Sequence, residues 1–239
     1  MLEPIHFPDM KPAPLEPGTL YLVATPIGNM EDITLRAIRT LRDCDLVAAE
    51  DTRHTGMLLK RLGLAKRQVS AHKFNEAKRS SEIVELLQGG GTVAVVSDAG
   101  SPGISDPGQR LVAAVIEAGY RVEAVPGACA LVAALTASGL ATDEFHFVGF
   151  LPVKSGQRVK RLAKLLELPG TVALYESPYR VVKLLGELEE YAPGRPVVLA
   201  RELTKKFEQI HRGLPAELLA AYNERKPKGE FVVLIGQAE

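Results

Sequence analysis

The feature that most constrains the fold is an alternation of short apolar runs with longer amphipathic segments, which begins just after Gly18. The short runs are rich in β-branched residues, as buried strands are, whereas the longer segments repeat apolar residues every three or four positions, as helices do. Strands that alternate with helices form an open, mostly parallel sheet. The predicted strands of this half are 19–25, 46–49, a short one around Val69, 92–96 and 121–125, and the predicted helices are 32–41, 55–62, 80–87, 109–118 and 128–137.

A second α/β unit is predicted from Pro126 onward, because Pro126-Gly127 breaks the alternation. Some of its strands follow one another without a helix between them, which favours a mixed sheet. The predicted strands are 145–150, 171–175, 197–201, 207–212 and 231–235, and the predicted helices lie near 159–167, 179–190 and 216–223. We therefore expect an α/β fold of two domains, 18–125 and 126–239, preceded by a proline-rich leader over 1–17. A cleft between two such domains is a favoured place for a ligand.

Composition excludes several classes of function. The chain of 239 residues has 29 basic and 29 acidic side chains and so no net charge, which excludes a polycationic clamp for nucleic acid. No apolar run approaches the roughly 18 residues that a membrane-spanning helix needs. The two cysteines, Cys44 and Cys129, have neither a metal-ligand spacing nor a disulfide framework. They favour a reducing, cytoplasmic compartment, and the sequence predicts no metal site.

The most informative segment is the loop Ser97–Gly108, which joins a predicted strand to a predicted helix. Such a loop lies at the carboxyl edge of its sheet, where α/β folds bind ligands. Its three glycines and two prolines make a rigid surface that a ligand can approach closely. The loop has no lysine or arginine and neither of the glycine motifs that cradle phosphates, so it suits a cationic, phosphate-free ligand such as S-adenosylmethionine. A plain strand–turn–helix connection is the alternative interpretation.

This loop is one of eight segments in which the chain resembles the tetrapyrrole methylase superfamily, and within it the branch of ribosomal RNA small subunit methyltransferase I. In that superfamily, enzymes of tetrapyrrole or diphthine synthesis usually carry Gly-Asp-Pro where this chain has Gly100-Ser101-Pro102, so the resemblance argues against a porphyrinogen or corrinoid substrate. The matching segments span nearly the whole folded chain in order: LYLVATPIGN (20–29), DLVAAEDTRHTGMLL (45–59), HKFNE (72–76), VSDAGSPGISDPG (96–108), VPGACA (125–130), FVGFLP (147–152), YESPYR (175–180) and ARELTKKFE (200–208).

The resemblance implies two α/β domains that bind S-adenosylmethionine between them. It also implies a homodimer that 2′-O-methylates a cytidine ribose in the decoding region of 16S ribosomal RNA. The residues that it places against the cofactor are Pro26, Gly100, Ser101, Pro102, Gly103, Ile104, Ser105, Ala128, Cys129, Tyr175, Glu176, Arg201 and Gly229.

Two carboxylates are candidates for orienting or deprotonating the ribose hydroxyl. Asp51 follows a predicted strand on the same sheet edge as the glycine-rich loop, and Asp98 lies in the loop itself. The alternative is that Asp51 or Thr52 caps the following helix. The polar residues within 72–76 either form a network near the substrate or satisfy the hydrogen bonds of their own loop.

Basic residues are the candidates for contacts to RNA phosphates. They are Arg53, Arg180, Arg201, Lys205 and Lys206. Alternatively, Lys205-Lys206 is a solvated hairpin turn. We interpret the basic residues of 158–164 as the solvent-exposed face of a helix. Two rival functions remain open, a methylase acting on a tetrapyrrole and a non-catalytic ribosome-binding module that retains a cofactor pocket.

Overall fold

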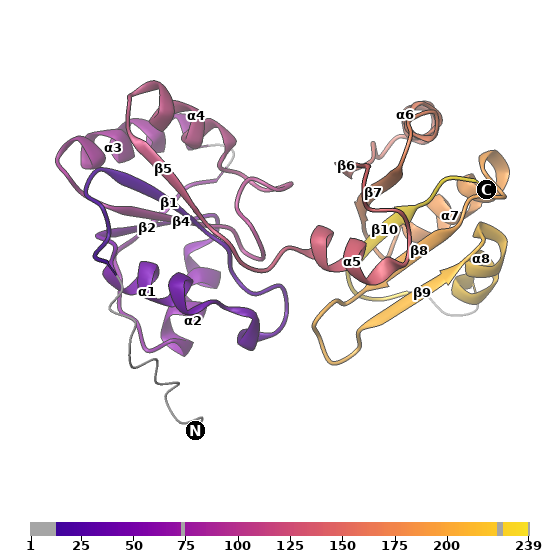
Figure 1. The fold of residues 1–239 in the computed structure, drawn as a ribbon, viewed down its shortest axis with the longest axis horizontal. Coiled ribbons are helices and arrows are strands. Elements are labelled where there is room, and N and C mark those ends of the chain that lie inside the picture. The colour runs from indigo at the N-terminus through magenta and orange to yellow at the C-terminus, as the bar shows by residue number, and fades with distance from the viewer. Residues whose placement is uncertain (1–12, 73–74, 224–226, 239) are drawn as a thin grey trace. The chain divides into compact units, whose positions relative to one another are not determined.

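The chain folds into two compact units in a computed structural model that describes residues 13–72, 75–223 and 227–238 (Figure 1). Among the described residues, the first unit takes those up to Val23, Leu35–Asp98 and Pro107–Val125. The second takes Ala24–Thr34, Ala99–Asp106 and the chain from Pro126 onward. Two internal segments within the range predicted for the first domain thus make their contacts in the second unit. Most of the predicted leader, residues 1–12, lies outside the described residues.

The first unit contains a sheet of five strands that are all parallel, which confirms the predicted α/β class. Strands β2 (Leu46–Ala49) and β4 (Val93–Val96) are buried along their whole length, which explains their continuous apolar sequences. In spatial order the strands are β3 (Gln68–Ser70), β2 (Leu46–Ala49), β4 (Val93–Val96), β1 (Thr19–Val23) and β5 (Arg121–Val125).

Helices cover both faces of this sheet (Figure 1). Helices α1 (Leu35–Asp43) and α2 (Thr52–Arg61) lie on one side, and α3 (Glu76–Gln88) and α4 (Gln109–Glu117) lie on the other. The second pair of helices buries an aliphatic face against the strands, which forms a hydrophobic core on that side of the sheet.

Glu76 connects the two helices of that second pair. Its buried carboxylate accepts hydrogen bonds from the backbone amides of Gly108, Arg110 and Leu111 at distances of 3.1, 3.1 and 3.2 Å. These amides open α4, whose N-cap glycine has no side chain to bind them. Glu76 therefore serves the hydrogen bonding of the fold, as does Asn75, whose side chain bonds the backbone of His72 and Ser70.

The second unit contains a mixed sheet, as predicted. Its first two strands are parallel and the other neighbouring pairs are antiparallel. In spatial order the strands are β6 (Phe145–Phe150), β7 (Thr171–Glu176), β10 (Phe231–Ile235), β8 (Val197–Arg201) and β9 (Gln209–Gly213).

Side chains on the central strand β10 alternate between two cores. Phe231, Val233 and Ile235 pack with α6 (Ser155–Leu166), α7 (Val181–Tyr191) and α8 (Pro215–Asn223). Val232 and Leu234 point to the opposite face, where α5 (Ala130–Ser138) covers the sheet. The three central strands β7, β10 and β8 are thus buried on both faces.

Local capping moves some helix starts away from the predicted positions. Helix α2 begins at Thr52 rather than at 55, because the Asp51 side chain accepts a hydrogen bond from the backbone N–H of Arg53 at 2.8 Å. Helix α1 begins at Leu35 rather than at 32, because a short 3₁₀ turn capped by Asn29 precedes it. In the described part of the chain, no helix has the length and apolar character needed to cross a bilayer.

Candidate active site

A cavity of about 340 Å³ lies in the second unit. It is lined by residues of the internal segments 24–34 and 99–106, by four strands of the mixed sheet, by the start of α5 and by loop residues that follow the strands. Every lining residue belongs to the second unit, so that unit alone forms the cavity.

Three neighbouring strands form one wall of the cavity. The register places Tyr175 of β7 opposite Val232 of β10, and Val232 opposite Ala200 of β8, so that these three lining residues form one row across the sheet. The Phe150 ring, which is mostly exposed, meets the Tyr175 ring edge to face at 5.8 Å. Burial raises the pKa of Tyr175 to about 12, so its phenol stays neutral near pH 7.

The glycine-rich loop forms another wall and is held in place by its backbone. Thr25 and Gly100 exchange two hydrogen bonds of 2.9 and 3.0 Å, and the Ser101 hydroxyl donates to the Ala128 carbonyl at 3.1 Å. Gly100 has a φ of +84°, in the left-handed region that disfavours other residues. A Cβ at Gly100 would also lie 3.3 Å from the Ile27 side chain. The loop therefore presents a fixed backbone to the cavity.

Negative charge predominates among the side chains that line this cavity. They include four carboxylates and one ammonium group but no guanidinium, and the charged residues are Asp106, Glu176, Glu202, Glu230 and Lys205. Such a lining favours a cationic ligand and disfavours a phosphate.

Glu176 is the most deeply buried of these carboxylates, with a side chain that is 0% exposed. Its Oε1 accepts a hydrogen bond from the backbone N–H of Ser177 at 2.7 Å. Its Oε2 lies 3.2 Å from the Arg180 guanidinium but has no hydrogen-bond partner within the described structure. Burial raises the pKa of Glu176 above the usual range, although Ser177 and Arg180 oppose the shift. The register pairs Glu176 with Phe231, whose side chain packs with α6, α7 and α8, so the Glu176 carboxylate lies on that face of the sheet beside Arg180.

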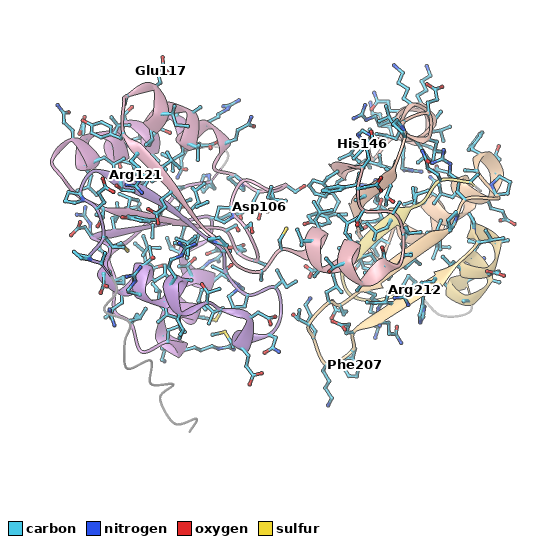
Figure 2. All side chains as sticks on the ribbon, viewed as in Figure 1. Asp106, Glu117, Arg121, His146, Phe207 and Arg212 are labelled. Atoms are coloured by element: carbon cyan, nitrogen blue, oxygen red, sulfur yellow. The ribbon has the colours of Figure 1, made fainter. Side chains whose placement is uncertain are left out.

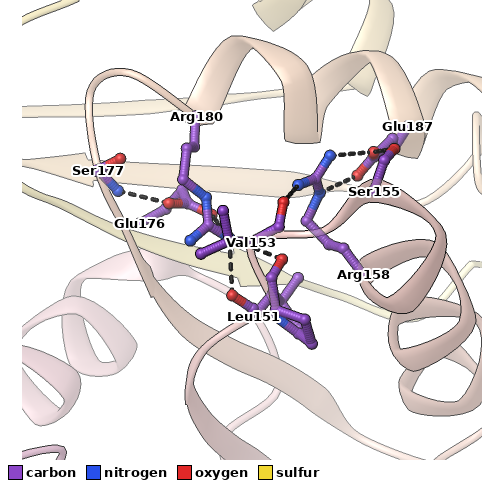
Figure 3. Close-up of polar contacts among 9 residues, drawn as sticks. Leu151, Val153, Ser155, Arg158, Glu176, Ser177, Arg180 and Glu187 are labelled. Carbon is purple, nitrogen blue, oxygen red and sulfur yellow. Dashed lines mark hydrogen bonds and ion pairs between the residues drawn. The ribbon is translucent and has the colours of Figure 1, made fainter.

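Buried arginines hold the chain around Glu176 (Figure 3). Arg180 donates to the carbonyls of Leu151 and Pro152 at 2.8 and 3.3 Å, which fixes the connection after β6. Arg158 of α6 forms a two-bond ion pair with Glu187 of α7 at 2.7 and 2.5 Å. The sequence-based interpretation of Arg158 as part of a wet helix face is therefore wrong, whereas the other basic residues of that helix are exposed. The pattern of α6 alone gave no sign of the partner on α7.

Lys205 also lies at the cavity, where its ammonium group is fully engaged. The Nζ atom contacts Glu202 Oε1 at 2.9 Å and Glu230 Oε2 at 2.8 Å. Partial burial opposes the charged form, yet the two carboxylates raise the pKa of Lys205 above its ordinary value. Burial likewise opposes ionisation of Glu202, but Lys205 and the backbone of Glu230 bring the pKa of Glu202 below its ordinary value.

The two candidate catalytic carboxylates come together in the first unit. The Asp98 carboxylate accepts a hydrogen bond from the backbone N–H of Asp51 at 3.2 Å. Asp51 caps α2 and pairs with the Arg53 guanidinium at 2.7 Å. Hydrogen bonds from the side chain and backbone of Arg53 hold the pKa of Asp51 far below its ordinary range. A carboxylate with so low a pKa is a weak proton acceptor.

The residues placed against the cofactor by resemblance fall into two groups. Gly100, Ser101, Ile104, Cys129, Tyr175 and Glu176 line the cavity. The others adjoin lining residues along the chain or support them; for example, Pro26 precedes Ile27, and Arg201 and Gly229 adjoin Glu202 and Glu230. Sequence reasoning missed the row of Ala200 and Val232, which only the antiparallel register of β8 and β10 brings beside Tyr175.

The candidate RNA contacts also differ in their surroundings. Arg53 and Lys206 are exposed, and the Lys206 Nζ lies 5.7 Å from the centre of the Phe207 ring. Phe207 occupies the far end of the loop between β8 and β9 (Figure 2). Arg180, Arg201 and Lys205 are bound to partners within the protein. In the described part of the chain no group of three or more His, Cys, Asp or Glu residues is arranged to hold a metal.

The sequence and the fold have counterparts among known proteins. The family model described as Tetrapyrrole (Corrin/Porphyrin) Methylases matches residues 19–219. This chain belongs to the tetrapyrrole methylase family. Within the family, curated relatives named "Ribosomal RNA small subunit methyltransferase I" share about half of its residues. The protein from Synechocystis sp. is 50% identical over 222 residues, which cover 92% of this chain and 80% of the relative. That from Mesorhizobium japonicum is 50% identical over 228 residues, covering 95% and 77%.

Solved structures of other members of the tetrapyrrole methylase family share the fold. The uroporphyrin-III-C-methyltransferase from Thermus thermophilus matches with a TM-score of 0.62 at 24% identity, covering 92% of this chain and 94% of that one. A cobalt precorrin-4 methyltransferase matches with a TM-score of 0.65 at 20% identity, covering 92% and 95%. A further uroporphyrin-III C-methyltransferase structure from Thermus thermophilus is complexed with S-adenyl homocysteine and matches with a TM-score of 0.63 at 22% identity, covering 91% and 97%. At these identities the likeness concerns the fold.

Proposed function

We propose that this chain is an S-adenosylmethionine-dependent methyltransferase that methylates the ribose 2′-hydroxyl of a cytidine in the decoding region of 16S ribosomal RNA. It acts in the cytoplasm and as a homodimer. The observation that carries the proposal is the cavity in the second unit, whose lining combines a glycine-rich loop with four acidic residues and a single lysine. The substrate class follows from the curated relatives, which are named for the RNA of the small ribosomal subunit.

The lining of the cavity fits the methyl donor. S-adenosylmethionine carries a sulfonium, an ammonium and a ribose diol, and it has no phosphate. The acidic residues Asp106, Glu202 and Glu230 of this lining suit such groups, and Glu176 borders the cavity at the end of β7. Gly100, Ser101 and Ile104 present the loop backbone to the ligand, and Tyr175 and Cys129 flank it. The remaining expected contacts each adjoin a lining residue along the chain. They are Pro26, Pro102, Gly103, Ser105, Ala128, Arg201 and Gly229.

The chain itself has to align the acceptor and manage one proton. The donor supplies an already activated methyl group, so the reaction needs no covalent enzyme intermediate and no cysteine nucleophile. We assign proton removal from the ribose hydroxyl to Asp98, which directly precedes the lining residue Ala99. Asp51 serves the reaction by orienting Arg53, because its ion pair holds the Arg53 guanidinium in a fixed direction.

RNA contacts are assigned first to Arg53 and Lys206, whose side chains are exposed. Arg53 uses Nε and Nη2 in its ion pair with Asp51 and would meet a phosphate with its remaining donors. Arg180 and Arg201 would contact RNA only with groups that their internal partners leave unused. A chain without net charge must hold RNA through a few such local contacts and through shape.

Mapping of ribose methylation on small-subunit RNA tests the proposal. Small subunits from cells that lack the enzyme are incubated with the protein and methyl-labelled S-adenosylmethionine. We expect label on one cytidine ribose in the decoding region. Asp98→Asn should bind the donor normally in calorimetry while methylating about 10²–10⁴-fold more slowly, because it lacks the proton acceptor.

Two results would contradict the proposal. Transfer of label to an added porphyrinogen rather than to RNA would establish the tetrapyrrole methylase instead. Binding of subunits and donor without any ribose methylation would favour the non-catalytic ribosome-binding module.

A further inference from the structure

Lys205, one of the basic residues predicted to contact RNA, is built into the wall of the cavity. Its ammonium group bridges Glu202 and Glu230, at 2.9 and 2.8 Å. The Glu202 side chain is only 17% exposed, so this half of the bridge is sheltered from solvent, whereas that of Glu230 is 85% exposed. With both carboxylates in place, one of the three ammonium donors is left, and the two negative charges beside it disfavour a phosphate.

The stem of Lys205 lies against the other internal segment of the second unit. A Cβ at Gly28 would come within 2.4 Å of Lys205 Cγ and 3.0 Å of Thr204 Oγ1. Gly28 has no positive φ, so the space taken by Lys205 is what requires glycine there. Lys205 thereby joins the segment 24–34 to the segment that follows β8, and each segment contributes a lining residue next to this contact, Ile27 and Leu203.

The segment that follows β8 adopts a backbone that needs such support. Glu202 and Thr204 have φ values of +50° and +64°, which are unfavourable for residues with side chains. Local hydrogen bonds tie the turn together, from Lys205 N to Glu202 O at 3.0 Å and from Glu208 N to Lys205 O at 3.0 Å. The side-chain bridge adds the only ion pairs described for Glu202 and Lys205 within the residues that the structure covers.

We propose that Lys205 is a positioning residue for the methyl-donor site, which it serves by holding Glu202 and Leu203 in the cavity wall against Gly28. The inference rests on the proposed function, since it concerns the same cavity. It replaces the role of Lys205 as an RNA phosphate contact and leaves that role to the neighbouring Lys206.

Donor binding by adjacent lysine variants tests this role. Lys205→Met keeps the aliphatic stem but removes the charge, and Lys206→Met is the matched control on the exposed side of the loop. By calorimetry we expect Lys205→Met to bind S-adenosylmethionine at least 10-fold more weakly than the unchanged protein, and Lys206→Met to bind it as the unchanged protein does. Lys205→Arg should recover part of the lost affinity.

S-adenosylhomocysteine separates positioning from simple charge effects, because its sulfur is uncharged. A displaced wall weakens both ligands alike, so we expect the same loss for each. If Lys205 acted only through its positive charge, Lys205→Met would strengthen binding of the cationic donor relative to S-adenosylhomocysteine, and that result would overturn the proposal.

A second variant displaces the side chain without changing its charge. Gly28→Ala should push Lys205 from its place and reproduce the loss of affinity, whereas Gly156→Ala, at a helical position with open space around it, should have no effect. Amide hydrogen exchange checks the loop without any ligand, and exchange at Lys205 and Glu208 should become faster in Lys205→Met and Gly28→Ala but not in the two controls.

The outcomes distinguish this inference from the function on which it rests. Donor binding by the unchanged protein that is equally strong in Lys205→Met refutes the positioning role and leaves the function intact. Absence of donor binding by the unchanged protein refutes the proposed function, and the exchange experiment then still decides whether Lys205 holds the loop.

Discussion

Single residues in this protein take their roles from their immediate surroundings. Asp51 and Glu176 carry the same functional group, yet the pKa of Asp51 is lowered by hydrogen bonds from Arg53 and that of Glu176 is raised by burial. The sequence identified Asp51 as a site candidate because it follows a predicted strand, and Glu176 through the family resemblance. It left open that Asp51 is also the cap of α2, a role that depends only on local geometry. Such local roles lie within the reach of sequence reasoning, whereas burial depends on distant segments.

The two cysteines allow this dependence on surroundings to be measured. Cys44 is buried, and burial raises the pKa of its thiol to about 11, so only ~0.1% is thiolate at pH 8. Cys129 is half-buried and lines the cavity. We expect iodoacetamide at pH 8 to modify Cys129 alone and S-adenosylmethionine to slow that modification, as peptide mass spectrometry would report. Equal modification of both thiols, or no protection by the donor, would contradict this expectation.

At the scale of elements, the sequence predicted the strands well and the links between helices poorly. Strands such as β2, β8 and β10 were predicted with their observed bounds, because a buried strand records its surroundings in its own residues. The tie between α6 and α7 escaped prediction, because Arg158 looks like any basic residue on an amphipathic helix until Glu187 is placed beside it. The same holds for the cavity wall, which depends on the register of antiparallel strands and on contacts such as that of Lys205 with Gly28.

The contribution of the Arg158–Glu187 ion pair to the free energy of unfolding can be measured. Arg158→Met removes the guanidinium and leaves the Glu187 carboxylate, whose side chain is 10% exposed, without its partner. Because a buried charge without compensation is costly, the free energy of unfolding should fall by about 3–5 kcal/mol. Arg161→Met, on the exposed side of the same helix, should change it by less than about 0.5 kcal/mol. Urea unfolding of both variants provides the comparison, and equal stabilities would show that the ion pair contributes nothing net.

At the scale of the whole molecule, the balance of charge limits how RNA can be held. Equal numbers of acidic and basic residues leave no broad attraction to a polyanion, so each exposed cation at the site contributes a large share. Both this balance of charge and the family resemblance could be recognised from the sequence alone. Which cations are free to act depends on the folded structure, because ion pairs and hydrogen bonds within the protein engage several of the candidates.

The salt dependence of RNA binding tests this view. Arg53→Ala removes an exposed guanidinium and keeps the backbone N–H that Asp51 uses to cap α2. We expect weaker binding of small-subunit RNA and a slope of log K against log salt that is shallower by about 1, as for the loss of one phosphate contact. Filter binding at several salt concentrations measures the slope, and Arg161→Ala on α6 is the control. An unchanged slope would remove Arg53 from the RNA interface.

The path of the chain between the two units has a consequence for how this protein is made and divided. Because Ala24–Thr34 and Ala99–Asp106 belong to the second unit, the chain passes from one unit to the other five times. A fragment that starts at Pro126 would lack Gly100, Ser101 and Ile27, and with them part of the donor site. During synthesis these early segments leave the ribosome long before β10, which supplies the opposite wall. The binding site is thus completed only after β10 has been translated, and it cannot be transplanted as one contiguous piece.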